Sequence, residues 1–308
     1  MTAHDVFNAI FNASIVVMIL TLVTGLGLSL TPHQILSPLR KVWVLVAAVV
    51  ANSLLAPLVA IGVSHALPLT TESRVGVELA AMAAAGPVGM KAAQLSKRAD
   101  MAMALSFTIV LQLINIAAAP LWAKQIVTGA TVEPWTIVKD LVLLVLAPLV
   151  IGQILRARHA EHAEGWQHSL EKVSNSALLL AIAVGLAVNW KTLTSSVGSW
   201  VLVASVIITV IIMALGWLAG RVGDSRSAIT VSMIAGMRFT PIGLIVIATV
   251  FNNDGAYLIP ALIFSLVSTV IPIVLGLELE RAAAHAKKPA GTAAPATPAT
   301  ATPAGSVS

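Results

Sequence analysis

Long apolar stretches separated by short polar segments run through almost the whole of this 308-residue sequence. A helix needs about 20 apolar residues to cross the hydrocarbon core of a bilayer. Only 10% of the residues are charged, against about a quarter in soluble domains. The pattern predicts an all-α polytopic membrane protein and excludes a soluble enzyme or a disordered chain. Nine spans are predicted, at 7–30, 41–65, 74–96, 101–128, 135–156, 168–189, 199–221, 227–251 and 256–279.

The basic residues of the loops fall unevenly on the two sides of the predicted membrane. Twelve of the 18 Lys and Arg lie on one side, and the other side holds Arg74, Lys124, Lys139 and Lys191. Cytoplasmic loops carry the excess of positive charge in membrane proteins. We therefore expect a multi-pass protein of the plasma (inner) membrane, with the N-terminus outside and the C-terminus in the cytoplasm.

Two regions differ in composition. Residues 285–308 form an Ala/Pro/Thr-rich segment with no apolar face to bury, which predicts a disordered cytoplasmic tail. Residues 1–284 are expected to form one transmembrane domain. The chain has no cysteine, which excludes disulfides and thiolate metal ligands.

The two halves of the sequence resemble each other weakly. Matching landmarks keep their order at offsets between 152 and 158 residues; they are Gly-Leu at 27–28 and 185–186, Asp100 and Asp254, and Pro120 and Pro272. The spans of 7–128 would repeat in 168–279, joined by the linking span 135–156. Each span would match the span five helices later, and because five is an odd number the copies would face opposite ways. Such inverted repeats are characteristic of secondary transporters.

Spans 3 and 8 are interrupted by helix-breaking residues at corresponding places. Proline removes a backbone donor, and glycine lets the chain leave helical dihedral angles. Backbone groups freed inside a membrane need partners from protein, water or ligand, and paired breaks indicate a binding site. The predicted breaks are at Gly86, Pro87 and Gly89 in span 3 and at Gly236 and Pro241 in span 8.

Each break carries a cation. Arg238 lies about 12 residues, or roughly 18 Å, into its span, where an unpaired guanidinium is costly. It needs a carboxylate, backbone carbonyls or an anionic substrate, and it serves either a binding site or a structural ion pair. Lys91 lies nearer the cytoplasmic end, where it either belongs to the site or extends to the interface.

Further polar side chains complete the set of candidate substrate- or ion-binding residues. Asn52, Gln112 and Asn115 either form helix–helix hydrogen bonds or line a cavity. Glu78, near the external end of span 3, is either an interfacial carboxylate or a gate or proton carrier. Thr240 lies within the second break. No catalytic residue and no metal site are expected.

Several motifs resemble those of the bile acid:sodium symporter family. Gly-Leu-Gly-Leu-Ser-Leu-Thr-Pro at 25–32 is similar to the end of a helix in that family, and the break of span 3 leading to Leu-Ser-Lys-Arg-Ala-Asp at 95–100 resembles its first crossing helix. The break of span 8 resembles the second. The resemblance implies a panel subdomain and a core subdomain, with two broken helices crossing at the midplane, as in bacterial members that lack the first of ten helices.

The sodium ligands that the resemblance implies are not retained. Ile234 and Arg238 stand where the family has an acidic residue and a glutamine, and Asn52 stands where it has another glutamine. Lys91 lies in the region of a Ser-Asn pair. Since cationic groups cannot ligate sodium, we hypothesise that Lys91 and Arg238 stand in for two sodium ions.

The function expected is secondary transport of a small organic anion by alternating access. It would proceed without sodium, by facilitated transport, exchange or proton coupling through Glu78. The alternatives are an efflux carrier of the same crossed-helix fold, for auxin-like acids or other anions, and a non-transporting membrane sensor. No cofactor and no nucleic-acid partner are expected, and no His-Glu-x-x-His or Gly-x-Ser-x-Gly motif indicates an enzyme.

Overall fold

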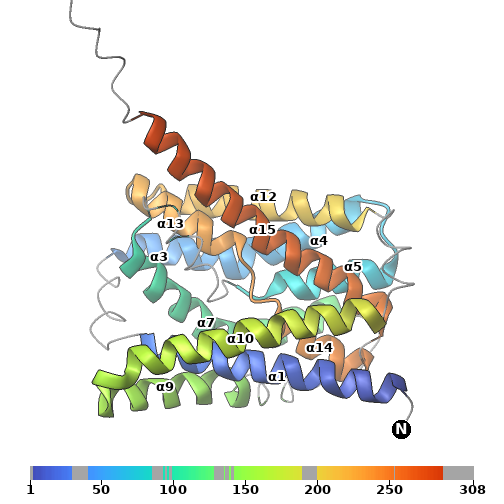
Figure 1. Ribbon diagram of the computed structural model, residues 1–308. Coiled ribbons are helices and arrows are strands. Elements are labelled where there is room, and N and C mark those ends of the chain that lie inside the picture. The colour runs from blue at the N-terminus through green and yellow to red at the C-terminus, as the bar shows by residue number, and fades with distance from the viewer. Residues whose placement is uncertain are drawn as a thin grey trace, which may run out of the picture.

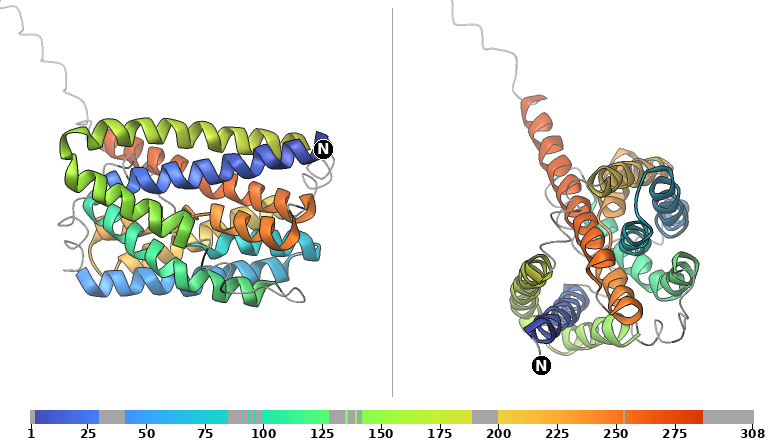
Figure 2. Two further views of the ribbon diagram at one scale, coloured as in Figure 1. Left: turned by 90° about the horizontal axis from the view of Figure 1, so that it is seen from below. Right: turned by 90° about the vertical axis from the view of Figure 1, so that its right-hand side faces the viewer.

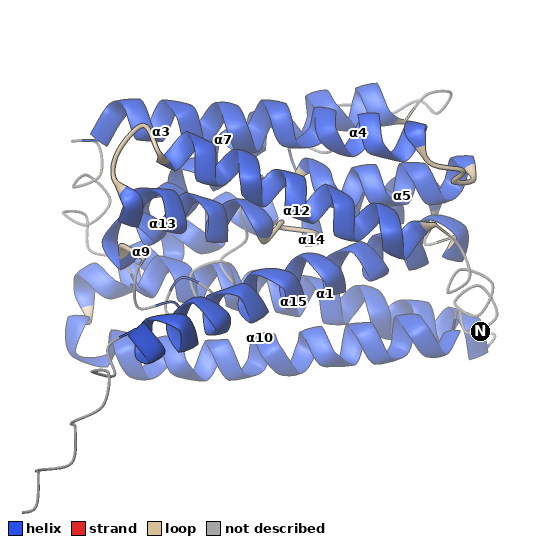
Figure 3. Cartoon of the chain, turned by 90° about the horizontal axis from the view of Figure 1, so that it is seen from above, coloured by secondary structure: helices blue, strands red, loops and turns tan. Residues whose placement is uncertain are grey.

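Every element in the described part of the chain is a helix, which confirms the all-α class (Figure 3). The computed structural model describes residues 3–29, 41–84, 93, 96, 99–127, 135, 139, 142–188, 200–252 and 254–286. The predicted tail lies outside the described residues, except for residues 285 and 286.

The first two spans contain α1 (Ala3–Ser29) and a composite helix. The composite consists of α3 (Val42–Val49), the π-helical segment η2 (Val50–Leu55) and α4 (Ala56–Ala66). Pro57 lacks a backbone N–H and its ring crowds the preceding turn, so the helix widens just before it. The same Leu-Ala-Pro-Leu-Val sequence recurs at 146–150, where η3 (Val142–Leu146) precedes α9 (Ala147–Arg158).

Several of the remaining helices begin at polar caps or at a proline. Thr70 caps α5 (Thr71–Met82), Asp100 caps α7 (Met101–Ile126) and Asp224 caps α13 (Ser225–Gly236). The helix α7 bends by 55° between residues 115 and 117. The others are α10 (Ala160–Val188), α12 (Val201–Gly220), α14 (Pro241–Phe251) and α15 (Gly255–Ala286).

Two helices differ in length from the predicted spans. The helix α10 begins at Ala160, eight residues before the predicted 168, because its polar first turns continue the apolar helix beyond the span. The helix α15 continues to Ala286, although the span was predicted to end at 279. Hydropathy marks the part of a helix that is apolar, and it does not mark where the helix ends.

Several helices are long and apolar enough to cross a membrane. By length and composition, five helical segments qualify in the described part of the chain, or six if the bent α7 is one span. Predicted spans 3 and 5 fall partly on residues outside that part, so nine spans stay a prediction. Large apolar side chains cover the outer surface, such as Trp43, which is 78% exposed. A surface of this kind is expected where lipid is the solvent.

The helices gather in two groups (Figure 2). The three-helix group consists of α1, α9 and α10, which pack on one another and lie together at the bottom of Figure 1. The larger group contains α3, α4, α5, α7, α12, α13 and α15, and α14 packs on α5 and α15 within it. Contacts of α10 with α15 and of α1 with α14 join the two groups.

Small residues allow the closest helix approaches. Gly216 and Gly220 of α12 form a G-x-x-x-G pair against α13, where a Cβ at Gly220 would lie 2.5 Å from the Ala228 Cα. In the three-helix group, Gly27 of α1 faces Gly152 of α9, and a Cβ at Gly27 would lie 3.0 Å from the Gly152 Cα. Close approach through small residues is how membrane helices gain packing energy.

Candidate functional site

The chain leaves the helix between α13 and α14. The helix α13 ends at Gly236, Met237 has extended dihedral angles (φ −92°, ψ 102°), and α14 begins at Pro241. A proline in the first turn needs no N–H partner, which makes it a suitable start for a helix inside a membrane. The four residues 237–240 place Arg238 in the gap between the two half-helices.

A second break follows α5. This helix ends at Met82, and Ala83 is extended (φ −79°, ψ 123°), so the chain leaves the helix three residues before Gly86. The predicted breaking residues Gly86, Pro87 and Gly89, together with Lys91, lie outside the described residues.

The two breaks meet at Arg238, whose side chain is only 6% exposed. Its Nε donates to the Ala81 carbonyl at 2.9 Å, and Nη2 donates to the Met82 carbonyl at 3.3 Å. The other contacts are to η2, where Nη1 donates to Asn52 Oδ1 at 3.2 Å and Nη2 to the Asn52 carbonyl at 3.0 Å. One guanidinium thus joins the end of α5, the π-helical segment and the second break.

The partners of Arg238 are neutral oxygens. In the described part of the chain no carboxylate forms an ion pair with it. The Ala81 and Met82 carbonyls belong to the last turn of α5, where the helix dipole is negative. The Asn52 carbonyl lies in the π-helical segment, and Asn52 Nδ2 donates to the Ala48 carbonyl at 2.9 Å. Carbonyl and amide oxygens at broken helices are the ligands that transporters offer to small cations.

Asn115 of α7 holds the chain that follows α5. Its Nδ2 donates to the Ala84 carbonyl and its Oδ1 accepts from the Ala84 N–H, both at 2.9 Å. Both backbone groups of one residue are therefore paired by a single buried amide. Gln112 lies one turn earlier, with its Oε1 3.5 Å from Asn115 Nδ2.

Glu78 lies in α5 one turn before the Arg238 contacts and is 3% exposed. Its Oε1 accepts from the Ser64 hydroxyl and lies 3.3 Å from Nδ1 of His65, both at the end of α4. The turn between α4 and α5 lies at the same end of the molecule as the N-terminus (Figure 1).

Thr240 closes the second break. Its side chain is buried, and its hydroxyl has no hydrogen-bond partner in the described part of the chain. Three residues later, Gly243 lies against the backbone of α5, where a Cβ would come 2.6 Å from the Leu79 carbonyl carbon. The start of α14 therefore crosses α5 in direct backbone contact.

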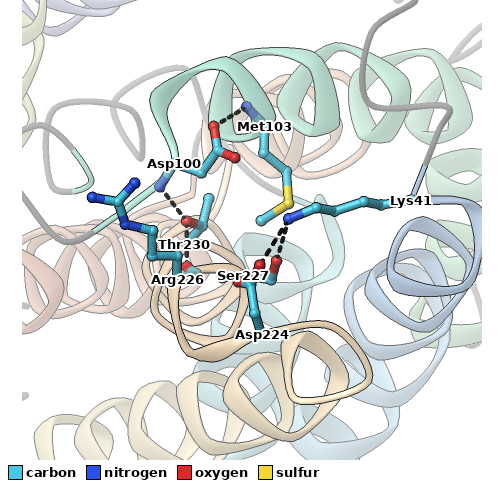
Figure 4. Close-up of polar contacts among 7 residues, drawn as sticks. All are labelled: Lys41, Asp100, Met103, Asp224, Arg226, Ser227 and Thr230. Atoms are coloured by element: carbon cyan, nitrogen blue, oxygen red, sulfur yellow. Dashed lines mark hydrogen bonds and ion pairs between the residues drawn. The ribbon is translucent and has the colours of Figure 1, made fainter.

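A polar cluster fixes the other end of α13 (Figure 4). Asp224 caps the helix by accepting from the Ser227 N–H at 2.7 Å, and Lys41 donates to Asp224 at 3.1 Å and to the Ser227 hydroxyl at 3.0 Å. The Ser227 N–H and hydroxyl, followed by Lys41, lower the pKa of Asp224 from 3.8 to about 2. Thr230 accepts from the Asp100 N–H at 2.7 Å, which ties α13 to the start of α7.

The structure brings together most of the predicted site residues that it describes. Asn52 and Arg238 are in contact, Asn115 binds the chain that follows α5, and Gln112 contacts Asn115. The sequence prediction missed Ser64 and His65 as partners of Glu78, and the backbone of Ala81–Ala84 as the acceptor. It also missed Trp122, whose indole N–H donates to the Ser53 carbonyl of η2 at 2.8 Å. Pro57 was the available signal, because a proline frees carbonyls in the turn before it.

Long apolar helices with a membrane-type surface, interrupted where a buried cation meets freed carbonyls, define a multi-pass membrane transporter. The sequence profile of the SBF-like CPA transporter family matches residues 3–281, and the chain belongs to this family. This confirms the resemblance to bile acid:sodium symporters, and the chain is a transporter rather than an enzyme.

A curated relative supports the same assignment. The chain is 26% identical over 249 residues to the uncharacterized sodium-dependent transporter YocS of Bacillus subtilis (strain 168). The match covers 78% of this chain and 75% of the relative.

Proposed function

We propose that the protein is a secondary transporter that moves a small organic anion across the plasma membrane by alternating access. Residues 1–284 would form the transport domain, with the N-terminus outside and the C-terminus in the cytoplasm. The three-helix group would correspond to the panel and the larger group to the core. Movement of one group against the other would expose the crossing of the broken helices to each side in turn.

The helix boundaries support the inverted repeat. The helix α5 spans 71–82 and α13 spans 225–236, an offset of 154 residues at both ends. The helices α7 and α15 begin at 101 and 255, again 154 apart. The caps keep the same offset, with Thr70 matching Asp224 and Asp100 matching Asp254. With nine spans, the two copies would face opposite ways.

The observation that carries the proposal is the set of neutral oxygens around Arg238. These oxygens would suit a sodium ion, and the guanidinium already occupies them. Arg238 is therefore proposed as a tethered cation that keeps the crossing positive, so an organic anion binds there without sodium. The relative is described as sodium-dependent, and the difference would lie in this residue.

Arg238→Gln tests the tethered cation. The wild-type protein in detergent should melt at the same temperature in sodium and in choline buffers. The variant exposes the Asn52, Ala81 and Met82 oxygens, so sodium should raise its melting temperature above the value in choline. The control is Arg281→Gln, an exposed residue that pairs with Glu278, which should show no sodium effect.

Uptake into proteoliposomes tests transport itself. Taurocholate, pyruvate and pantothenate represent three chemical classes of organic anion. Entry of at least one probe at equal rates in sodium and choline supports the proposal. Strict dependence on sodium would overturn the tethered cation, and failure of all three probes to enter would count against an organic-anion transporter.

A further inference from the structure

Ser64 allows the buried Glu78 carboxyl to exist in either protonation state. The Ser64 hydroxyl donates to Glu78 Oε1, and it lies 3.0 Å from the Ile61 carbonyl. If Glu78 takes a proton, its O–H can donate to the Ser64 oxygen while the serine turns its own hydrogen to Ile61. The Ser64 hydroxyl thus has a partner in both states, which avoids the cost of an unpaired buried group.

His65 connects this carboxyl to the solvent. Its side chain is 53% exposed, and Nδ1 lies 2.9 Å from the Ile61 carbonyl and 3.3 Å from Glu78 Oε1. A carbonyl only accepts, so Nδ1 carries the hydrogen. When a proton from water binds Nε2, the Nδ1 proton can pass to Oε1. The imidazole then ends neutral, with its hydrogen on Nε2, and the reverse steps release the proton.

Few other charges face Glu78. Arg74, one turn earlier in α5, acts on it together with His65. The helices α12 and α14, which pack on α5, carry no ionisable side chain. In the described part of the chain, this end of the molecule also carries Glu72 at the start of α5, Lys124 of α7, Asp254 at the cap of α15, and Tyr257.

We propose that Glu78 carries the coupling proton of this transporter and is loaded through His65. The inference rests on the proposed function, since it supplies the coupling ion for the same site. An ionised Glu78 one turn from the Arg238 contacts repels an incoming anion, and a protonated Glu78 does not. Proton and anion therefore favour each other's binding by the same factor. The coupling is symport, driven by a proton gradient that is acidic outside.

Infrared spectroscopy tests the proton site without any substrate. The pH-induced difference spectrum of the protein in lipid should contain a carboxylic acid C=O band that Glu78→Gln removes. Glu72→Gln, at the start of the same helix, is the matched control and should leave the band in place. A band that survives in Glu78→Gln, or a wild-type spectrum without one, would overturn the proposal.

Proteoliposomes with a pH-sensitive dye inside test the coupling. An inward proton gradient should concentrate a transported probe, and entry of the probe should acidify the interior. In Glu78→Gln the probe should still equilibrate, while accumulation falls to the level without a gradient. Accumulation that persists in this variant would overturn the inference. If none of the three probes enters, the proposed function fails while the infrared band still decides whether Glu78 holds a proton.

Discussion

Arg238 illustrates how a single cation is stabilised inside a membrane without a carboxylate. An arginine at the centre of a membrane helix costs about 2.5–3.5 kcal/mol on insertion scales. A hydrogen bond from a charged group contributes about 1.5–3 kcal/mol, and the guanidinium donates four. These hydrogen bonds offset the cost of burial and fix the side chain between the two breaks.

Asn115 should be needed for stability because it pairs both backbone groups of Ala84. Asn115→Leu keeps the size of the side chain and leaves a buried N–H and a buried carbonyl unpaired, at a cost of about 2–4 kcal/mol. Thermal unfolding in detergent should show a clear loss of melting temperature. Gln125→Leu, at an exposed position of the same helix, should be nearly neutral. Equal effects of the two variants would contradict this role.

The sequence indicates which polar side chains need a hydrogen-bond partner inside the membrane, and it does not indicate which groups those partners are. Arg238, Asn52 and Asn115 are conspicuous because polar side chains are rare in apolar spans. Many of their partners are backbone groups of Ala81, Met82 and Ala84. Backbone groups are the same in every residue, so nothing in the sequence marks these three as acceptors.

Among the elements, the crossing of α14 over α5 depends on Gly243. Gly243→Ala would place a Cβ against the Leu79 backbone and push α5 away from the second break. We expect a loss of about 1–3 kcal/mol in stability, as for other overpacked sites, together with weaker binding of a transported anion. Both effects can be measured by thermal unfolding with and without the probe.

Gly62→Ala is the matched control for this variant. Gly62 also lies in a helix, α4, and a Cβ there meets nothing within 4 Å. Alanine favours a helix over glycine by about 1 kcal/mol, so this variant should be neutral or slightly more stable. A destabilised Gly62→Ala protein would show that the loss at Gly243 is not specific to the crossing.

The cap of α13 should make stability depend on pH at the acidic end of the range. The Asp224 pKa is lowered from 3.8 to about 2, so its contribution is complete above 3.8 and is lost as the pH falls toward 2. Asp224→Asn still caps the helix but cannot titrate, and its melting temperature should change less over this interval. Measurements in lipid nanodiscs at several pH values check this.

Lys41→Gln separates the cap from the ion pair. The Ser227 N–H and hydroxyl contribute more to the lowered pKa than Lys41 does. The variant should therefore keep most of the pH dependence seen in the wild type. If the dependence disappears, the ion pair and not the cap is its main cause.

Helix starts were easier to predict than changes within a helix. Asp100 and Asp224 precede apolar runs as capping residues, and α7 and α13 begin within two residues of the predicted spans. The π-helical segment η2 was not predicted, since neither its apolar residues nor its polar pair Asn52 and Ser53 marks where a helix widens. Its position depends on which backbone carbonyls Pro57 leaves without a partner, and on the donors that neighbouring helices offer them, such as the Trp122 indole N–H.

For the molecule as a whole, the two groups of helices should move as separate bodies. Since the chain has no native cysteine, spin labels can be placed at single introduced ones. Labels at the exposed Val173 of α10 and Leu218 of α12 lie in different groups. Their distance distribution should contain two populations, and a transported anion should change the ratio between them.

Labels within one group provide the control. Val17 of α1 and Val173 of α10 are both exposed and both belong to the three-helix group. Their separation should have one population that the anion does not alter. If it changes as much as the distance between the groups, the helices do not move as two bodies.

The π-helical segment η2 also accommodates one extra residue in the second span, because a π-helical turn holds one residue more than an α-turn does. Deleting one residue from 50–55 would leave the span about as apolar and as able to insert. It would let the widened turn close as an ordinary α-turn, with the flanking helices still in phase. The carbonyls of the segment would then change their backbone partners, and the Asn52 oxygens that bind Arg238 would shift. A deletion that leaves the hydropathy of the span unchanged would therefore alter the acceptors of Arg238.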